Sequence, residues 1–140
     1  MRLVLDTDVV VSALRSPAGG SAALLRSIRR GSGTLLLSPA LLLEYGAVCQ
    51  LAEHRLASGL SAREIGAFLD GLVLLAEPAT ACFRWRPQLR DPGDEMVLEA
   101  AVNGRAAAIV TFNLRHDAIV PERFGIEIMR PAEALRRIST

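Results

Sequence analysis

Short apolar runs that each end in a polar residue recur along this chain, and stretches with helical spacing separate them. The three clear runs are Leu3–Leu5 before Asp6, Leu35–Leu37 before Ser38, and Ala107–Val110 before Thr111. The segment Ile126–Ile128 is a weaker fourth run. Strands that alternate with helices predict an α/β fold in which right-handed crossovers join a mostly parallel sheet.

The helical stretches carry signals that indicate where each helix begins. Ser38 is a predicted N-cap before Pro39, and the helical pattern then runs to about residue 58. Ser61 and Glu64 have the spacing of a capping box. Asp91 is a predicted N-cap with acids in the turn that follows.

Two further helices are expected over residues 21–30 and 131–138. Residues 8–14 could form either a strand or a helix, because three valines favour a strand while Asp8 could open a helix. Residues 77–92 contain three prolines and are expected to form a short strand followed by a loop.

Length and composition limit the class of protein. A chain of 140 residues, 51% of them hydrophobic, predicts a single folded domain over residues 1–140. No apolar stretch approaches a membrane span, and the early acid Asp6 does not fit a signal peptide, so we expect a cytoplasmic protein without membrane association. Cys49 and Cys82 show no metal-site spacing and are expected to be reduced, buried thiols.

Three acidic residues occupy positions where an apolar residue would be expected. Asp6 ends the first apolar run, Glu44 lies on the apolar stripe of the helix after Ser38, and Asp94 lies centrally on the stripe of the helix after Asp91. A carboxylate that faces a core is costly unless its charge is compensated. Three of them on separate elements predict one shared divalent cation, Mg²⁺ or Mn²⁺, held by oxygen ligands.

Each acid also has an ordinary structural explanation. Asp6 could cap the next helix, Glu44 could reach water from the edge of its stripe, and Asp94 could be the capping partner of Asp91. Asn113, just after the third run, could supply a neutral oxygen ligand or be a turn residue. The weaker candidates for the shell around these acids, each with a capping or loop role as its alternative, are Asp8, Ser12, Asp91, Thr111 and Asp117.

A divalent cation at such a site would activate a water molecule and neutralise charge on a phosphoryl group. This chemistry favours phosphodiester hydrolysis over acyl transfer. The sequence contains no GxSxG element, no Cys–His pairing and no glycine-rich phosphate loop.

In these residues the chain resembles a PIN domain of the bacterial branch assigned to toxins of type II toxin–antitoxin systems, the VapC-like proteins. The matching stretches are residues 3–8 (LVLDTD), 38–45 (SPALLLEY), 90–95 (RDPGDE), 109–115 (IVTFNLR) and 130–133 (RPAE). They follow the family's order over nearly the whole chain. Asn113 stands where the family often has an acid, and Asp8 stands where it usually has Asn, which leaves open whether one ion or two would bind.

The resemblance implies a three-layer α/β/α sandwich around the sheet and a metal-dependent endoribonuclease. Asp6 and Asp94 would bind Mg²⁺ or Mn²⁺ directly, Glu44 would bind the ion or orient its water, and Asn113 would complete the shell. These four are therefore the expected catalytic residues. Cleavage would leave 5′-phosphate and 3′-hydroxyl ends on the RNA substrate. The resemblance also implies a cognate antitoxin as partner and a homodimer.

Two other functions remain open at this stage. Residues 5–8 (LDTD) also resemble the DxD start of a haloacid-dehalogenase-type phosphatase, in which Asp6 would be a nucleophile. That chemistry normally requires a later basic residue, and the chain contains no Lys. The second alternative is a non-catalytic module that binds RNA or a protein, with a site degraded at Asn113.

Overall fold

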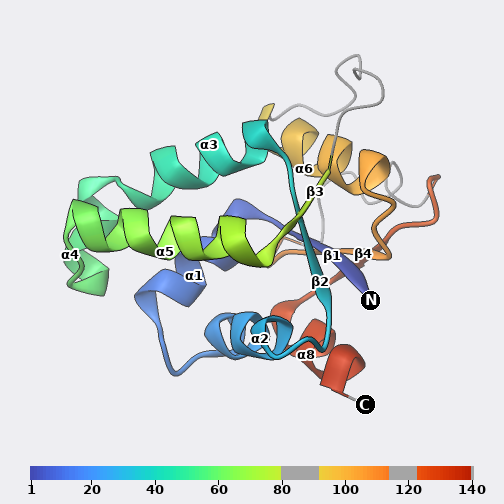
Figure 1. Ribbon diagram of the computed structural model, residues 1–140, viewed down its shortest axis with the longest axis horizontal. Helices are drawn as coiled ribbons and strands as arrows, with labels where there is room; N and C mark the ends of the chain where they lie inside the picture. Colours follow the sequence, from blue (N-terminus) through green and yellow to red (C-terminus); the bar gives the residue numbers. More distant parts are fainter. Residues whose placement is uncertain (80–91, 114–122, 140) are drawn as a thin grey trace.

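The computed structural model describes residues 1–79, 92–113 and 123–139, and for 92–94 it describes the helix but not the side chains (Figure 1). Five strands form one sheet in the order β3-β2-β1-β4-β5, and every neighbouring pair is parallel. The strands are β1 (Arg2–Leu5), β2 (Thr34–Leu37), β3 (Glu77–Pro78), β4 (Ala108–Val110) and β5 (Glu127–Met129). The predicted parallel α/β architecture is confirmed, and the four predicted strand runs agree with the observed strands to within one residue at either end.

Seven helices connect and cover these strands in the described part of the chain. They are α1 (Thr7–Arg15), α2 (Gly20–Arg29), α3 (Pro39–Cys49), α4 (Ala52–Ser58), α5 (Ala62–Leu75), α6 (Pro92–Asn103) and α8 (Pro131–Ser139). Helix α6 packs against β1, β2 and β4, and α2 packs against α8. Figure 1 shows α6 above β1 and β4 and the pair of α2 and α8 below them, so the predicted α/β/α sandwich is also confirmed.

Residues 8–14 form a helix, which settles the choice that the sequence left open. The Asp6 carboxylate caps α1 by accepting a hydrogen bond from the Thr7 backbone N–H. Val9, Val10 and Val11, the residues that favour a strand, are all buried in the core. Burial of these three side chains and the N-cap therefore outweigh their intrinsic preference for extended backbone.

One helix predicted from Pro39 to about residue 58 is in fact two helices, α3 and α4, with Gln50 and Leu51 between them. The break lets α4 contact α1, and the Gln50 side chain donates a hydrogen bond from Nε2 to the Ala62 carbonyl at 2.9 Å. Because the predicted helix breaks at this point, Ala52 does not continue the buried stripe expected of one long helix, and it is exposed. The predicted capping box of α5 is present, since Ser61 and Glu64 exchange side-chain to backbone hydrogen bonds.

The three central strands, β2, β1 and β4, are apolar and buried except for the first residues of β1 and β2. Leu3, Val4 and Leu5 of β1 are each 0% exposed. The register pairs Leu5 of β1 with Val110 of β4, so the carboxyl ends of these two central strands lie side by side. Whatever follows them in the sequence is held at one edge of the sheet.

Tyr45 holds α3 against the carboxyl edge of the sheet. Its ring is completely buried, and its hydroxyl donates a hydrogen bond to the carbonyl of Leu5, the last residue of β1. Burial, together with the nearby charge of Asp6, holds the pKa of the Tyr45 hydroxyl well above its usual range, so the group stays protonated and remains a donor. No local sequence pattern indicated this bond, because it joins residues 40 positions apart.

We expect Tyr45→Phe to lower the free energy of unfolding by about 1–3 kcal/mol, because the buried Leu5 carbonyl would lose its partner from α3. Urea denaturation followed by circular dichroism measures the change. Tyr45→Phe removes one oxygen atom and leaves the packing of the ring in place. A variant as stable as the wild type would show that water or a shifted backbone donor replaces the hydroxyl.

Candidate metal centre at the carboxyl edge of the sheet

The order of the strands places a crevice beside the carboxyl end of β1. The chain runs from β1 outward through β2 to β3, then returns to β4 on the other side of β1. Ligands of open parallel α/β sheets bind at such a reversal, outside the carboxyl ends of the strands. Asp6 directly follows β1, and Thr111 directly follows β4.

Asp6 has two structural partners. Its Oδ1 accepts a hydrogen bond from the Thr7 backbone N–H at 2.8 Å, and its Oδ2 accepts one from the Thr111 hydroxyl at 2.7 Å. Its capping role and its place in the crevice are therefore compatible, although the sequence presented them as alternatives. The cap fixes the carboxylate at the positive end of α1.

Asp8 is the second carboxylate at this edge. Its Oδ2 accepts a hydrogen bond from the Phe112 backbone N–H at 3.0 Å and lies 3.3 Å from the Thr111 hydroxyl oxygen. Because a hydroxyl carries one proton, the shorter contact to Asp6 takes most of the Thr111 donation. The other oxygen of Asp8, Oδ1, is buried and has no hydrogen-bond partner within the described part of the chain.

The environment of Asp8 disfavours its charge. Burial, and secondly the neighbouring charge of Asp6, raise the pKa of Asp8 from 3.8 to about 6, although the bonds from Phe112 and Thr111 act in the opposite direction. Two carboxylates that share one hydroxyl donor are thus held close together against their mutual repulsion. The repulsion in such a carboxylate pair is relieved when one acid keeps its proton or when a bound cation compensates the charge.

Asn113 joins the cluster through its backbone. Its N–H donates to the Thr111 hydroxyl oxygen at 3.0 Å, which orients that hydroxyl toward the carboxylates. The residue itself is exposed. The expected role of its side chain as an oxygen ligand therefore stays a prediction.

Glu44 and Asp94 lie on two helices that pack together, α3 and α6. Glu44 is half-buried and directly precedes Tyr45, which is bonded to the end of β1. The backbone of residue 94 lies in the first turn of α6, while the side chain of Asp94 lies outside the described residues. Val97, Leu98 and Ala101, the apolar neighbours used to place Asp94, are buried as predicted.

The remaining candidates divide into those that the structure places and those that it does not. Ser12 is half-buried on α1, one turn after Asp8. Asp91 and Asp117 lie outside the described residues, as does Cys82, whereas Cys49 is buried and free as expected. Among the described side chains, no three of the types Asp, Glu, His or Cys gather closely enough to bind an ion. Of the described candidates, hydrogen bonds bring together Asp6, Asp8, Thr111 and the Asn113 backbone.

The residues present fit a hard divalent cation. Both carboxylates offer oxygen, and a buried Asp8 oxygen without a partner is a donor atom that a cation would satisfy. A positive ion would also remove the repulsion that raises the Asp8 pKa. Asp8 was a weak candidate from sequence, where the D-x-D spacing was the only signal, and the structure places it beside Asp6.

The family model of the PIN domain matches residues 2–115. The chain belongs to the PIN domain family. PIN domains are generally nucleases, and this match spans every candidate site residue except Asp117. Asp6, Asp8 and Thr111 thus lie at the carboxyl edge of the sheet of a PIN domain.

A solved structure agrees with this fold. A chain in the crystal structure of VapBC2 from Rickettsia felis, bound to a DNA fragment from their promoter, superposes with a TM-score of 0.58 and 15% sequence identity. The alignment covers 91% of this chain and 97% of that chain. Among curated proteins, none matches this chain in sequence.

We expect the metal-free wild type to lose more stability than Asp8→Asn as the pH rises from about 4 to about 7. The Asp8 carboxyl has a pKa of about 6 in the folded chain, against 3.8 for a free aspartate side chain as in the unfolded chain. The folded chain therefore holds the proton more tightly. This contribution is present at low pH and is lost as the pH rises through that interval. Thermal denaturation in EDTA across the range measures it, and parallel curves for the two proteins would contradict the assignment.

Proposed function

We propose that this protein is a divalent-metal-dependent endoribonuclease that cleaves RNA phosphodiester bonds. The observation that carries the proposal is the Asp6–Asp8 carboxylate pair, joined by the Thr111 hydroxyl at the strand-order reversal of a PIN-family chain. Neither a binding surface for an apolar ligand nor a structural ion pair requires two crowded acids at that position. A nuclease that holds a cation against a phosphoryl group does require them.

We propose one role for each residue at the metal site. Asp6 and Asp94 hold Mg²⁺ or Mn²⁺ directly, Glu44 holds the ion or orients water, and Asn113 completes the shell. Asp8 adds negative charge and, with Thr111, fixes the orientation of Asp6. A bound divalent cation supplies Lewis-acid stabilisation of phosphoryl charge and lowers the pKa of water.

The phosphatase alternative receives no support. The PIN-family match covers the whole segment, residues 5–8, on which that alternative rested. A non-catalytic binding module remains as an outcome of the experiment below.

The proposed setting is a toxin–antitoxin pair in the cytoplasm, with a cognate antitoxin as protein partner and a homodimer as the assembly. The fold similarity to the VapBC2 toxin–antitoxin complex supports a partner of this kind. Within the described residues, no helix combines the length and apolarity needed to cross a bilayer.

Exposed leucines on three neighbouring helices support a protein interface. Leu43 of α3 is 75% exposed, Leu56 of α4 is 84% exposed, and Leu74 of α5 is 89% exposed. Helices α3 and α5 contact each other and run side by side in Figure 1. Large apolar side chains exposed on adjoining helices are compatible with a contact to another protein.

We expect Asp6→Asn and Asp94→Asn each to reduce RNA cleavage by at least about a hundredfold, because each removes a charge that holds the cation. Cleavage of a mixed-sequence RNA is measured with Mg²⁺, with Mn²⁺ and with EDTA, and circular dichroism checks the fold. Asp70→Asn is the matched control, since Asp70 is an exposed acid on α5.

Wild-type protein that binds Mn²⁺ by calorimetry yet leaves RNA intact would favour the non-catalytic module. Equal cleavage by Asp94→Asn and wild type would reject the role of Asp94. Cleavage that persists in EDTA would reject the metal dependence altogether.

We expect Leu74→Glu to weaken self-association by at least about tenfold, because it puts a charge where we propose an apolar contact. Sedimentation equilibrium measures the monomer–dimer constant. Arg136→Glu is the control, because Arg136 is exposed on α8, which is not one of the three helices that carry these leucines. Identical constants for Leu74→Glu and wild type would place the interface elsewhere.

A further inference from the structure

Phe112 is an aromatic residue attached directly to the carboxylate pair. It follows Thr111 just after the carboxyl end of β4, and it is 44% exposed. Its backbone N–H donates a hydrogen bond to Oδ2 of Asp8 at 3.0 Å. The Phe112 side chain branches from the atom bonded to that nitrogen, so the ring cannot lie far from the two acids.

Hydrogen bonds hold the backbone on both sides of this ring. Before it, Thr111 is buried, and its hydroxyl donates to Oδ2 of Asp6 at 2.7 Å. After it, the Asn113 N–H donates to the same Thr111 hydroxyl oxygen at 3.0 Å. Binding of a ligand to Phe112 would therefore restrict only the rotation of its side chain, which keeps the entropic cost of binding small.

The other aromatic residues that the structure describes have different positions. Tyr45, which also reaches the carboxyl edge of the sheet, is completely buried, and Phe68 is partly buried against the core. Phe124 is 43% exposed, but it comes just before β5 and so lies at the amino edge of the parallel sheet. Within the described part of the chain, an exposed ring and the carboxylate pair thus coincide at Phe112.

We propose that the Phe112 ring stacks on the nucleobase next to the phosphodiester bond that is cleaved. This inference rests on the proposed function, because only a nucleic-acid substrate brings a base to this edge of the sheet. The acids mark where the phosphodiester would lie, and a base on the neighbouring sugar comes within reach of a ring anchored to Asp8. Aromatic side chains stack on bases of every type, since each base has a π face.

A contact with another protein is the competing use of this ring. The exposed leucines proposed for self-association lie on α3, α4 and α5, whereas Phe112 follows β4. The bond from Phe112 to Asp8 links the ring to the candidate metal centre and not to that leucine surface. An uncharged ring also attracts a base without repelling the phosphate beside it. These observations favour the substrate.

Phe112→Ala should raise KM for a short, unstructured single-stranded RNA about tenfold, because stacking is lost while the backbone N–H that binds Asp8 remains. Phe112→Trp should keep the wild-type KM, since it retains an aromatic face. Phe124→Ala is the matched control, because it removes a ring of nearly equal exposure at the opposite edge of the sheet, and it should cleave like the wild type. Circular dichroism checks the fold of each variant.

An RNA that lacks the base beside the cleaved bond tests the contact itself. The abasic nucleotide should raise the wild-type KM about tenfold and leave the KM of Phe112→Ala at the value measured with intact RNA, because the two changes remove the same contact. If the ring only supports the loop, the two losses are independent and multiply. Independent losses would overturn the proposal.

The remaining outcomes separate this inference from the nuclease proposal. Equal KM for Phe112→Ala and wild type would reject the role of Phe112 and leave RNA cleavage standing. Unchanged KM with weaker self-association would assign the ring to a protein interface instead. If the wild type leaves RNA intact, the nuclease proposal fails, and fluorescence anisotropy of the same RNA decides on the ring. A Kd about tenfold weaker for Phe112→Ala than for Phe124→Ala would support stacking, and equal values would reject it.

Discussion

The parallel pairing of β1 with β4 is the constraint on which the candidate site depends. It aligns Leu5 with Val110 and so brings together Asp6 and Thr111, which are 105 positions apart in the sequence. The Thr111 hydroxyl donates toward the carboxylates and accepts from the Asn113 backbone N–H. The Thr111 hydroxyl oxygen thereby links the end of β4 to the start of α1, the helix that follows β1.

This arrangement concentrates negative charge where the fold gains little from it. Asp6 has a structural use as the cap of α1, but Asp8 is crowded by burial and by Asp6, and its Oδ1 has no partner among the described residues. Local conflicts of this type are common at functional sites, because a sequence selected only for stability would avoid them. The positive end of α1 and the backbone N–H of Phe112 offset part of the cost.

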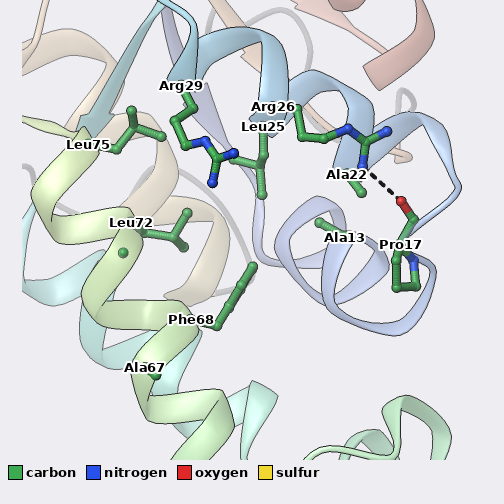
Figure 2. Close-up of a pocket in the computed structure, with 11 residues that line it drawn as sticks. Ala13, Pro17, Ala22, Leu25, Arg26, Arg29, Ala67, Phe68, Leu72 and Leu75 are labelled. Carbon is green, nitrogen blue, oxygen red and sulfur yellow. Dashed lines mark hydrogen bonds between the residues drawn. The ribbon is translucent and has the colours of Figure 1, made fainter.

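Helix α1 contributes residues both to the carboxylate cluster and to the apolar groove between α1, α2 and α5 (Figure 2). Its first turn carries Asp8, and Ala13 in its later part lines the groove. The two ends differ in chemistry: oxygen donors gather at the carboxyl edge of the sheet, whereas small apolar residues and arginine side chains surround the groove. Both depend on how α1 is seated against its neighbours, since its valines are buried in the core.

The sequence by itself determined the class of fold, the strands and the acids worth examining. Apolar runs that end in polar residues are sufficient for this, because parallel strands must be buried and their carboxyl ends must share an edge. The N-cap of α5 and the start of α3 were also readable, since capping depends on neighbouring residues. The PIN-family match confirmed the resemblance on which the roles of Glu44 and Asp94 rest.

Tertiary structure decided what no local pattern could express. It turned the three valines of α1 into a buried helix, divided the predicted helix at Gln50, and gave Tyr45 a bond to Leu5. It also changed Asp8 from a peripheral residue into one of two carboxylates that share a hydroxyl. These outcomes depend on atoms that are distant in the chain and close in space. Burial and long-range pairing therefore set them, whereas local propensity set the elements themselves.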